Sequence, residues 1–415
     1  MAEWISKTLG ELTSFISKGI PPKYVDEENE NTIRVLNQKC NRNFEISYNE
    51  SRIHNAAVKK VPEKKLLHSG DVLINSTGTG TAGRVAQIFN IPMPTTVDGH
   101  MILLRPTKEI DPLYYGYVIK SYQKKIESLA EGSTGQTEIN RQRLQDEIYI
   151  TFPKDRALQK EIGTFLFQID EKIKNNSEIN NNLEQQAQAL FKKWFIDNPE
   201  NVDWSAGTFR ELIQSTLNGD WGKEAPTGNN TEKVYCIRGA DIPEVKAGNK
   251  GKMPTRYILP KNLANKKLEA GDIVVEISGG SPTQSTGRCT AITQSLLDRY
   301  DSSMVCTNFC KAIKPKNGYS LFVYYYWQYL YEKGVFFSYE NGTTGIKNLD
   351  FTGFIETEPI IVPTFDKVQA FDDYCKSIFN QVFANGKQSE QLASLRDTLL
   401  PKLMSGELDV SNIEL

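Results

Sequence analysis

Glycine and hydroxyl residues gather in one short segment, where they could hold a phosphate group. The residues Gly78-Thr79-Gly80-Thr81-Ala82-Gly83 have the spacing of a dinucleotide-binding loop, and Asp98 follows twenty residues after the first glycine. Such a loop must open a helix, because the helix N-terminus holds the pyrophosphate. The segment instead leads into a strand-like run at residues 84–89, with Pro92 soon after. We therefore interpret it as a tight loop whose threonine hydroxyls and backbone N–H groups face a phosphate.

Other patterns that would support catalysis are incomplete. The string Asp111-Pro112-Leu113-Tyr114 has leucine where a methyltransferase tetrapeptide has its second proline, and no G-x-x-x-x-G-K-[ST] loop is present. The close pair Cys306 and Cys310 lacks the second pair that a zinc site needs. No nucleophile pattern accompanies the histidines, which are His54, His68 and His100. The sequence predicts structural histidines, free thiols, and a chain without a catalytic centre, metal or cofactor.

The composition fits a globular chain whose charges are nearly balanced. With 39% hydrophobic and 24% charged residues, 415 residues can form two or three hydrophobic cores. No apolar run reaches the ~18 residues of a membrane span and the first residues lack a secretory signal, so we expect a cytoplasmic protein. Basic residues outnumber acidic ones by 19 to 18 in residues 1–153, and the net charge of the chain is −2. Tight binding to nucleic acid would need charge gathered on one face, or phosphate contacts supplied by partner subunits.

The two halves of the sequence repeat each other. Thr8-Leu9-Gly10-Glu11-Leu12 reappears as Thr208-Phe209-Arg210-Glu211-Leu212, at an offset of 200 residues. The offset grows to 201, 204 and 210 for three further pairs, which are residues 69–74 with 270–275, 83–86 with 287–290, and 148–153 with 358–363. Such self-similarity indicates two copies of one fold, and the growing offset indicates loops of different length between matched strands. Short β-branched runs and a helix at 112–129, matched at 320–331, predict a mixed α+β domain in each copy.

A helical segment follows each copy. Apolar residues recur at steps of three and four between Leu158 and Trp194, and again between Phe371 and Leu403. This is a heptad pattern whose middle is polar, at Asn176 and Asn180 and at Asn385 and Ser389. A helix over residues 154–195 would be roughly 60 Å long, about twice the width of such a domain, so it needs a partner. We expect antiparallel pairing, with polar residues that fix the register or bind another protein; packing of each helix on its own domain is the alternative.

The order of domain, helix, domain and helix closely resembles the specificity subunit of Type I restriction-modification enzymes, over the whole chain. The motifs are Gly70-Asp71-Val72-Leu73-Ile74, Gly83-Arg84-Val85-Ala86, residues 132–140, residues 189–195 and the closing run 394–408. The resemblance implies an α+β fold in which two similar α/β target recognition domains, at 1–153 and 199–363, form an internal pseudo-twofold repeat. Two long antiparallel coiled-coil helices, central at 154–198 and distal at 364–415, would join them.

The resemblance also implies a function. The chain would be a non-catalytic subunit that reads an asymmetric bipartite site in double-stranded DNA and directs two methyltransferase (modification) subunits to it. Restriction (translocase/nuclease) subunits are a further partner that it leaves open. The second copy departs from the pattern at residues 279–286 and 345–348, so the halves should read different bases. Two other classes stay open: a tandem module that binds protein or carbohydrate, and an enzyme assembled between the two halves.

The candidate DNA-binding residues are polar side chains on segments that differ between the copies. Arginine can grip guanine, and glutamine or asparagine can grip adenine. Arg84 and Arg288 recur in both copies, which suits a phosphate or structural role better than base discrimination. The first copy contributes Thr77, Thr79, Thr81, Arg84, Gln136, Asn140 and Arg141. The second contributes Ser281, Gln284, Ser285, Arg288, Lys347 and Asn348.

Overall fold

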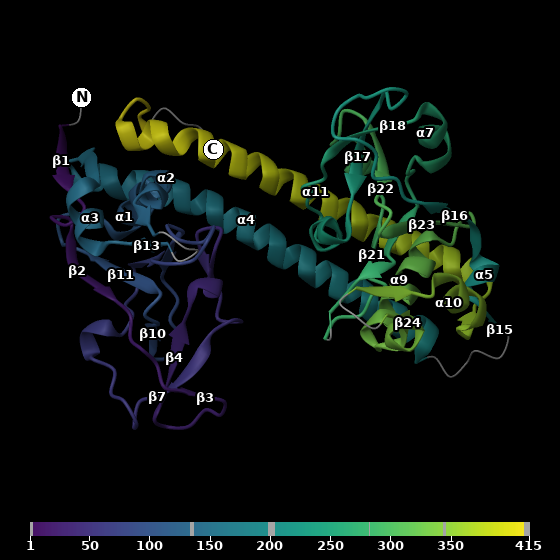
Figure 1. Cartoon of the computed structure of the whole chain (residues 1–415), viewed down its shortest axis with the longest axis horizontal. Coiled ribbons are helices and arrows are strands. Elements are labelled where there is room, and N and C mark those ends of the chain that lie inside the picture. Colours follow the sequence, from purple (N-terminus) through teal and green to yellow (C-terminus); the bar gives the residue numbers. More distant parts are fainter. Residues whose placement is uncertain (1–2, 133–136, 198–203, 282, 343–345, 411–415) are drawn as a thin grey trace. The chain divides into compact units, whose positions relative to one another are not determined.

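The computed structural model describes residues 3–132, 137–197, 204–281, 283–342 and 346–410. The chain divides into two compact units, Met1–Glu171 with Leu392–Leu415, and Lys172–Gln391. Each unit contains one mixed α/β domain and parts of two long helices, α4 (Arg156–Phe191) and α11 (Phe365–Ser405) (Figure 1). Among the described residues, no helix is both long and apolar enough to cross a membrane.

The domain of the first unit is built on two four-stranded sheets. The first is antiparallel in the order β2-β11-β8-β9, and the second has the order β10-β4-β7-β3 with β10 parallel to β4. Asp111 begins the helix after β11, because its carboxylate accepts from the backbone N–H groups of Leu113 and Tyr114. The strands are β1 (Trp4–Thr8), β2 (Thr13–Lys18), β3 (Tyr24–Val25), β4 (Thr32–Leu36), β5 (Asn41–Arg42), β6 (Glu45–Ile46), β7 (Arg52–Asn55), β8 (Asp71–Asn75), β9 (Val85–Ile88), β10 (Thr95–Val97), β11 (Met101–Pro106), β12 (Ala130–Glu131), β13 (Glu138–Ile139) and β14 (Tyr149–Pro153). The helices are α1 (Pro112–Ser121), α2 (Gln123–Ser128) and α3 (Arg141–Glu147).

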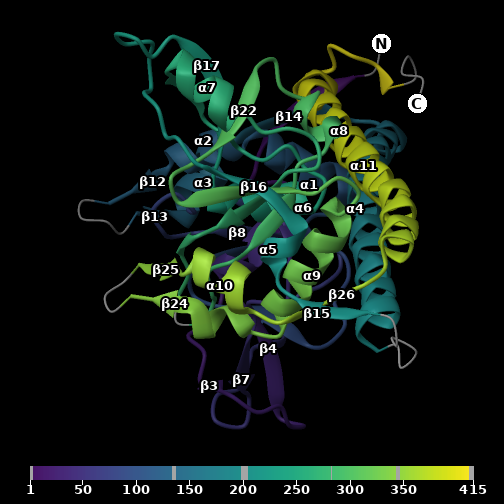
Figure 2. The same ribbon diagram turned by 90° about the vertical axis from the view of Figure 1, so that its right-hand side faces the viewer.

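The domain of the second unit repeats this topology, with three strands in place of four in its second sheet. Its sheets have the orders β16-β23-β19-β21 and β18-β17-β22, and β17 is parallel to β22 as β4 is to β10. The strands are β15 (Ser205–Gly207), β16 (Ile213–Asn218), β17 (Glu232–Ile237), β18 (Thr255–Ile258), β19 (Ile273–Glu276), β20 (Ser278–Gly279), β21 (Cys289–Ala291), β22 (Ser303–Cys306), β23 (Cys310–Pro315), β24 (Glu340–Asn341), β25 (Lys347–Leu349) and β26 (Ile360–Val362). The helices are α5 (Phe209–Leu212), α6 (Ile242–Lys246), α7 (Pro260–Lys266), α8 (Gln294–Leu297), α9 (Ser320–Glu332) and α10 (Phe351–Thr357). Figure 2 shows β24, β25 and α10 next to one another.

The repeated glycines mark places where two backbones approach closely. A Cβ on Gly19 would overlap the carbonyl oxygens of Val97 and Asp98, and one on Gly219 would overlap the carbonyl oxygen of Thr307. Each glycine follows the first strand of its antiparallel sheet. The two copies therefore share a framework, and the internal repeat predicted from the sequence is confirmed.

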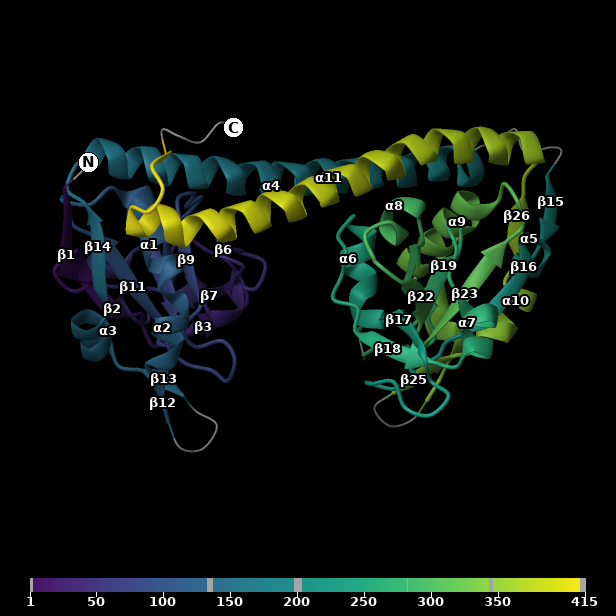
Figure 3. The same ribbon diagram turned by 90° about the horizontal axis from the view of Figure 1, so that it is seen from above.

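In the second unit, α4 and α11 pack over the aromatic helix α9, which separates them from the sheet (Figure 3). Phe191 of α4 and Phe371 of α11 are buried, with ring centroids 5.8 Å apart, and both rings contact rings of α9. This packing gives one continuous apolar core. The aromatic run at 320–331 is thus a buried helix between two layers.

The polar middle of the helix pair is a layer of hydrogen bonds. The Asn176 amide donates to Ser389 Oγ at 3.2 Å and to Gln388 Oε1 at 2.9 Å, and the Asn385 amide donates to Asn180 Oδ1 at 2.8 Å. Residue numbers rise along α4 while their partners on α11 fall, so the helices are antiparallel, as predicted. Asn176 is 1% exposed and Asn180 is 5% exposed, so these amides fix the register of the two helices.

Candidate nucleic-acid interface

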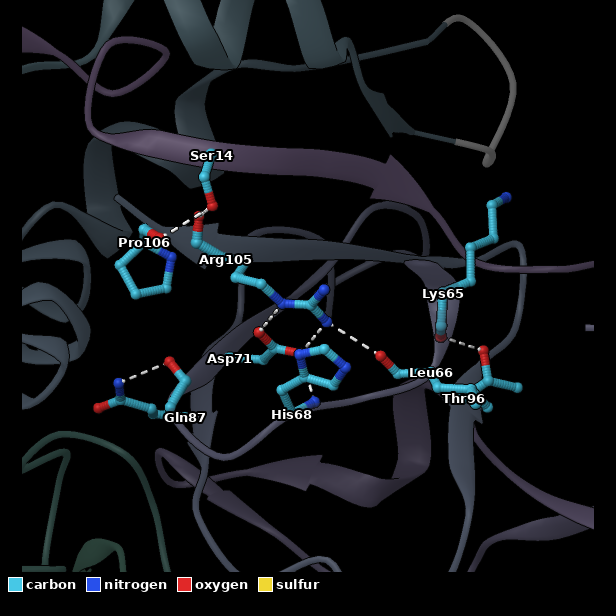
Figure 4. Close-up of polar contacts among 10 residues, drawn as sticks. Ser14, Lys65, Leu66, His68, Asp71, Gln87, Thr96, Arg105 and Pro106 are labelled. Atoms are coloured by element: carbon cyan, nitrogen blue, oxygen red, sulfur yellow. Dashed lines mark hydrogen bonds and ion pairs between the residues drawn. The ribbon is translucent and has the colours of Figure 1, made fainter. Parts of the chain in front are cut away.

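The repeated Gly-Asp motif joins neighbouring strands of the antiparallel sheet (Figure 4). Asp71 on β8 is 1% exposed and accepts two hydrogen bonds from Arg105 on β11, from Nε and from Nη2, both at 2.8 Å. Arg105 Nη2 also donates to the Leu66 carbonyl at 2.9 Å, and the His68 backbone N–H donates to Asp71. In the second copy Lys314 stands in place of the arginine, with Nζ 3.2 Å from the Asp272 carboxylate. The motif therefore holds together the strands that lead into the candidate loops.

Four side chains of the first domain are linked by hydrogen bonds beside the candidate loop. Thr81 Oγ1 donates to Gln38 Oε1 at 3.1 Å, and Gln38 Nε2 donates to Thr77 Oγ1 at 3.1 Å. Thr77 Oγ1 lies 3.0 Å from His100 Nδ1, within hydrogen-bond distance. These contacts hold the imidazole through Nδ1 and leave Nε2 outside the linked group.

The glycine-rich segment is a loop, as the sequence predicted. Gly78, Gly80 and Gly83 have φ angles of +104°, +71° and +88°, a backbone region that favours glycine. The chain then enters strand β9 and not a helix. The guanidinium of Arg84 folds back to donate to the Gly80 carbonyl at 3.0 Å, and Thr79 is exposed. The loop thus presents hydroxyl and guanidinium groups from a fixed backbone.

A second segment reaches the same place from β13 and α3. The Ile139 N–H donates to the Ser76 carbonyl at 2.8 Å, which joins β13 to the start of the loop. Asn140 caps α3 by accepting from the N–H groups of Gln142 and Arg143, so its amide oxygen is already used. Arg141 is exposed. Gln136 lies outside the described residues.

Three cations gather beside this segment. Lys65 Nζ donates to the carbonyl oxygens of Lys18 and Gly19, at 2.8 and 2.9 Å. Burial and the nearby Arg141 charge lower the pKa of Lys18, and the same two causes lower the pKa of Lys65. Glu138 pairs with Lys18. The segment thus has two lysines and one arginine near one carboxylate, and cations of this kind are the groups that contact DNA phosphates.

In the second domain three of the six candidates, Arg288, Gln284 and Ser281, are linked by hydrogen bonds. Arg288 makes a two-pronged ion pair with Glu276, with both N···O distances at 2.8 Å, and this hydrogen bonding raises the pKa of the arginine. With its amide oxygen turned to Arg288, Gln284 accepts from Nε at 2.8 Å and Nη1 at 3.0 Å. Ser285 is 3% exposed. Ser281 pairs with Gln284 across a tight turn, through backbone hydrogen bonds at 2.8 and 3.2 Å.

The remaining two candidates lie on β25, which pairs with β20. Lys347 Nζ donates to Glu340 Oε2 at 2.7 Å and lies over the Phe337 ring, and Asn348 accepts from Ser278 Oγ. The structure thus brings the two predicted segments of each domain together. It does not bring Arg288 or Ser285 to the surface as free groups, so their part in DNA contact stays a prediction.

Gln38, His100 and Phe309 belong to this region but were not among the predicted residues. Gln38 comes from a 3-10 turn at Gln38–Cys40, far from the repeated motifs, and no pattern marks it. His100 and Phe309 directly precede β11 and β23, which hold the same place in the sheets of the two copies. Extending the repeat to the start of these strands would have paired them.

Comparison with known proteins agrees with this architecture. Residues 1–185 match the family described as Type I restriction modification DNA specificity domain. The specificity subunit of the Type I restriction enzyme MjaIX from Methanocaldococcus jannaschii is 25% identical, over 99% of this chain and 95% of that one. The HindI specificity subunit from Haemophilus influenzae is 23% identical, over 98% and 100%. The S subunit of a Type I system from M. genitalium shares the fold, with a TM-score of 0.57 and 17% identity over 97% and 96% of the two chains.

The first domain, with the start of α4, is thus similar to the DNA specificity domain of Type I restriction-modification systems. Along nearly its whole length the chain is similar to the specificity subunits of such systems.

Proposed function

We propose that this chain reads an asymmetric, bipartite sequence in double-stranded DNA, one half with each domain. The observation that carries the proposal is that two domains of one topology hold different side chains at the same place. The loop after β8 presents Thr77, Thr79 and Thr81, and the loop after β19 presents Ser278 and Ser281. Equivalent frameworks with different loops are what two different half-sites require.

We further propose that the chain is non-catalytic and recruits two methyltransferase subunits, with restriction subunits as a further partner. The near-neutral sequence supports the need for partner subunits. Strong DNA binding uses many phosphate contacts, and in this chain, with its net charge of −2, acidic residues balance the basic ones. The cluster of Lys18, Lys65 and Arg141 supplies some of these contacts in the first domain. Since the target would be DNA, we expect the complex to act in the cytoplasm.

Exchange of one domain tests the proposal. The complex of this chain with its modification subunits is compared with one in which residues 1–153 come from a relative, and methylated sites are mapped across the genome. One half of the methylated sequence should change and the other should stay. The matched control carries the relative's residues 199–363 and should change only the other half. Absence of any methylated motif with the native chain, or changes in both halves from either exchange, would contradict the proposal.

A further inference from the structure

The residue that precedes the central strand occupies the same place in the two domains. The carbonyl of His100, before β11, accepts from the Ser76 N–H at 2.8 Å. The carbonyl of Phe309, before β23, accepts from the Ile277 N–H at 2.9 Å and the Ser278 N–H at 3.2 Å. In both copies, then, the side chain at this place stands beside the start of the candidate loop. One copy has an imidazole there and the other has a phenyl ring.

The Phe309 side chain is exposed, and hydrogen bonds hold the backbone on both sides of it. The side chain is 58% exposed, although Thr307, two residues earlier, is only 3% exposed. The Thr307 N–H donates to the Ile237 carbonyl at 3.0 Å, and the Cys310 N–H donates to the Thr307 carbonyl at 2.9 Å. These bonds fix the backbone around Phe309. A large exposed apolar side chain beside polar loop residues is available to a partner surface.

The His100 side chain is also held in place, but it is polar. Its Nδ1 is hydrogen-bonded to Thr77 Oγ1 at 3.0 Å, and Thr77 Oγ1 in turn accepts from Gln38. Its backbone N–H donates to Asp98 Oδ1 at 2.9 Å. The ring is exposed, and its second nitrogen, Nε2, lies on the side away from Thr77, so it can form a hydrogen bond with a partner.

We propose that this shared place contacts one base pair in each half-site, and that Phe309 selects thymine through its 5-methyl group while His100 forms a hydrogen bond with a base edge through Nε2. This proposal rests on the proposed function. In the major groove the thymine methyl is the one apolar group that a phenyl ring can contact, whereas an imidazole nitrogen can pair with a polar group of a base edge. The different side chains at one place would make the two half-sites differ at a corresponding position.

The decisive probe is removal of the methyl group alone. The complex of the chain with its modification subunits first selects its site from random duplexes, and each thymine of the second domain's half-site is then replaced by deoxyuridine. At one position the native complex should lose about five- to tenfold in affinity, and the Phe309→Ala complex should bind the two duplexes equally. Phe309→Leu, which keeps an apolar side chain, should retain part of the discrimination.

Four outcomes overturn the inference. Native binding that is indifferent to deoxyuridine at every thymine would exclude a methyl contact. The same result is expected if the ring instead wedges between bases, and the inference fails in that case too. If Phe309→Ala abolishes recognition of the whole half-site and also lowers the melting temperature of the protein, the ring has a structural role. If the native complex selects no motif, the proposed function fails and the inference fails with it, whereas a native motif that Phe309→Ala leaves unchanged refutes the inference alone.

Matched substitutions complete the test. Phe365→Ala removes another exposed phenylalanine, 44% exposed at the start of α11, and should leave every base preference unchanged. His100→Phe places the phenyl ring in the first domain, and the position read there should shift toward thymine by several-fold. Retention of the original base in that variant would show that His100 does not contact it.

Discussion

Replacement of the buried amides between α4 and α11 should show whether they act as a pair. In Asn385→Leu, the Oδ1 atom of Asn180 loses its donor at 2.8 Å while it stays buried, and Gln381 loses the acceptor of its amide. An unsatisfied buried polar atom costs about 1–3 kcal/mol, and we expect the free energy of unfolding to fall by that amount. Asn180→Leu should cost a similar amount, because it leaves the Asn385 amide and the carbonyl of Ala247 without their partner.

The double variant, Asn180→Leu with Asn385→Leu, should be less damaged than the sum of the two singles. Leucine resembles asparagine in size, and two apolar side chains facing each other need no hydrogen bond, so the coupling should be about 1–2 kcal/mol in favour of the double variant. The double variant should instead lose the fixed register of the two helices, because apolar pairs allow the helices to slide along each other. Asn181→Leu, exposed on the same helix, corrects for the higher helix propensity of leucine.

Guanidinium unfolding followed by tryptophan fluorescence measures these differences in the relevant unit. Four of the five tryptophans, Trp194, Trp204, Trp221 and Trp327, lie in the second unit together with the amides. The reasoning is refuted if the two single substitutions add without coupling, or if either single variant is as stable as Asn181→Leu.

Four further predictions follow from particular contacts. Arg84→Ala should lower the slope of log affinity against log salt by about one unit if it meets a phosphate. Arg288→Ala should instead cost about 3 kcal/mol of unfolding free energy, because it leaves a buried carboxylate without its partner; a lower salt slope with full stability would reverse that assignment. Gly219→Ala should destabilise the second unit by several kcal/mol in thermal unfolding, because its Cβ overlaps a carbonyl, whereas Gly99→Ala has open space and should change stability little. Burial raises the pKa of Asp372 from 3.8 to about 6, so its protonated form favours the fold and that contribution is lost as pH rises through this range. Asp372→Asn should therefore gain stability relative to the native chain between pH 3.8 and about 6, and a constant difference in urea unfolding would count against it.

The features predicted from the sequence depend on neighbours along the chain. Heptad spacing predicts the long helices because an apolar seam at steps of three and four is a local pattern, and the repeat predicts two copies of one fold. Local patterns were less reliable for short elements. The expected helix at 112–129 is two helices, α1 and α2, that meet at Tyr122. The helix α10, at Phe351–Thr357, was not predicted at all.

The candidate site was only partly predictable because its contacts cross between strands. Glu276 pairs with Arg288 across β19 and β21, and no spacing rule links the two residues in advance. His100 meets Thr77 only because β8 and β11 are neighbours in the sheet. Polar loop residues look alike in a sequence whether they are solvated, cap a helix as Asn140 does, or pair with a buried acid.

The two-stranded ribbons β1-β14 and β15-β26 make each recognition domain a closed insert in the chain. Trp4 pairs with Pro153 in the first ribbon, and Ser205 pairs with Val362 in the second. The chain therefore enters and leaves each domain across neighbouring strands, whatever the length of the polypeptide between them. Loops inside a domain can lengthen, as the drift in offset from 200 to 210 records, without displacing the strand that leads into the following helix. Recombination at the two ends of a domain's coding sequence, whose residues lie on neighbouring strands, can then exchange the whole domain. The chain would acquire a new specificity while its long helices stay unchanged.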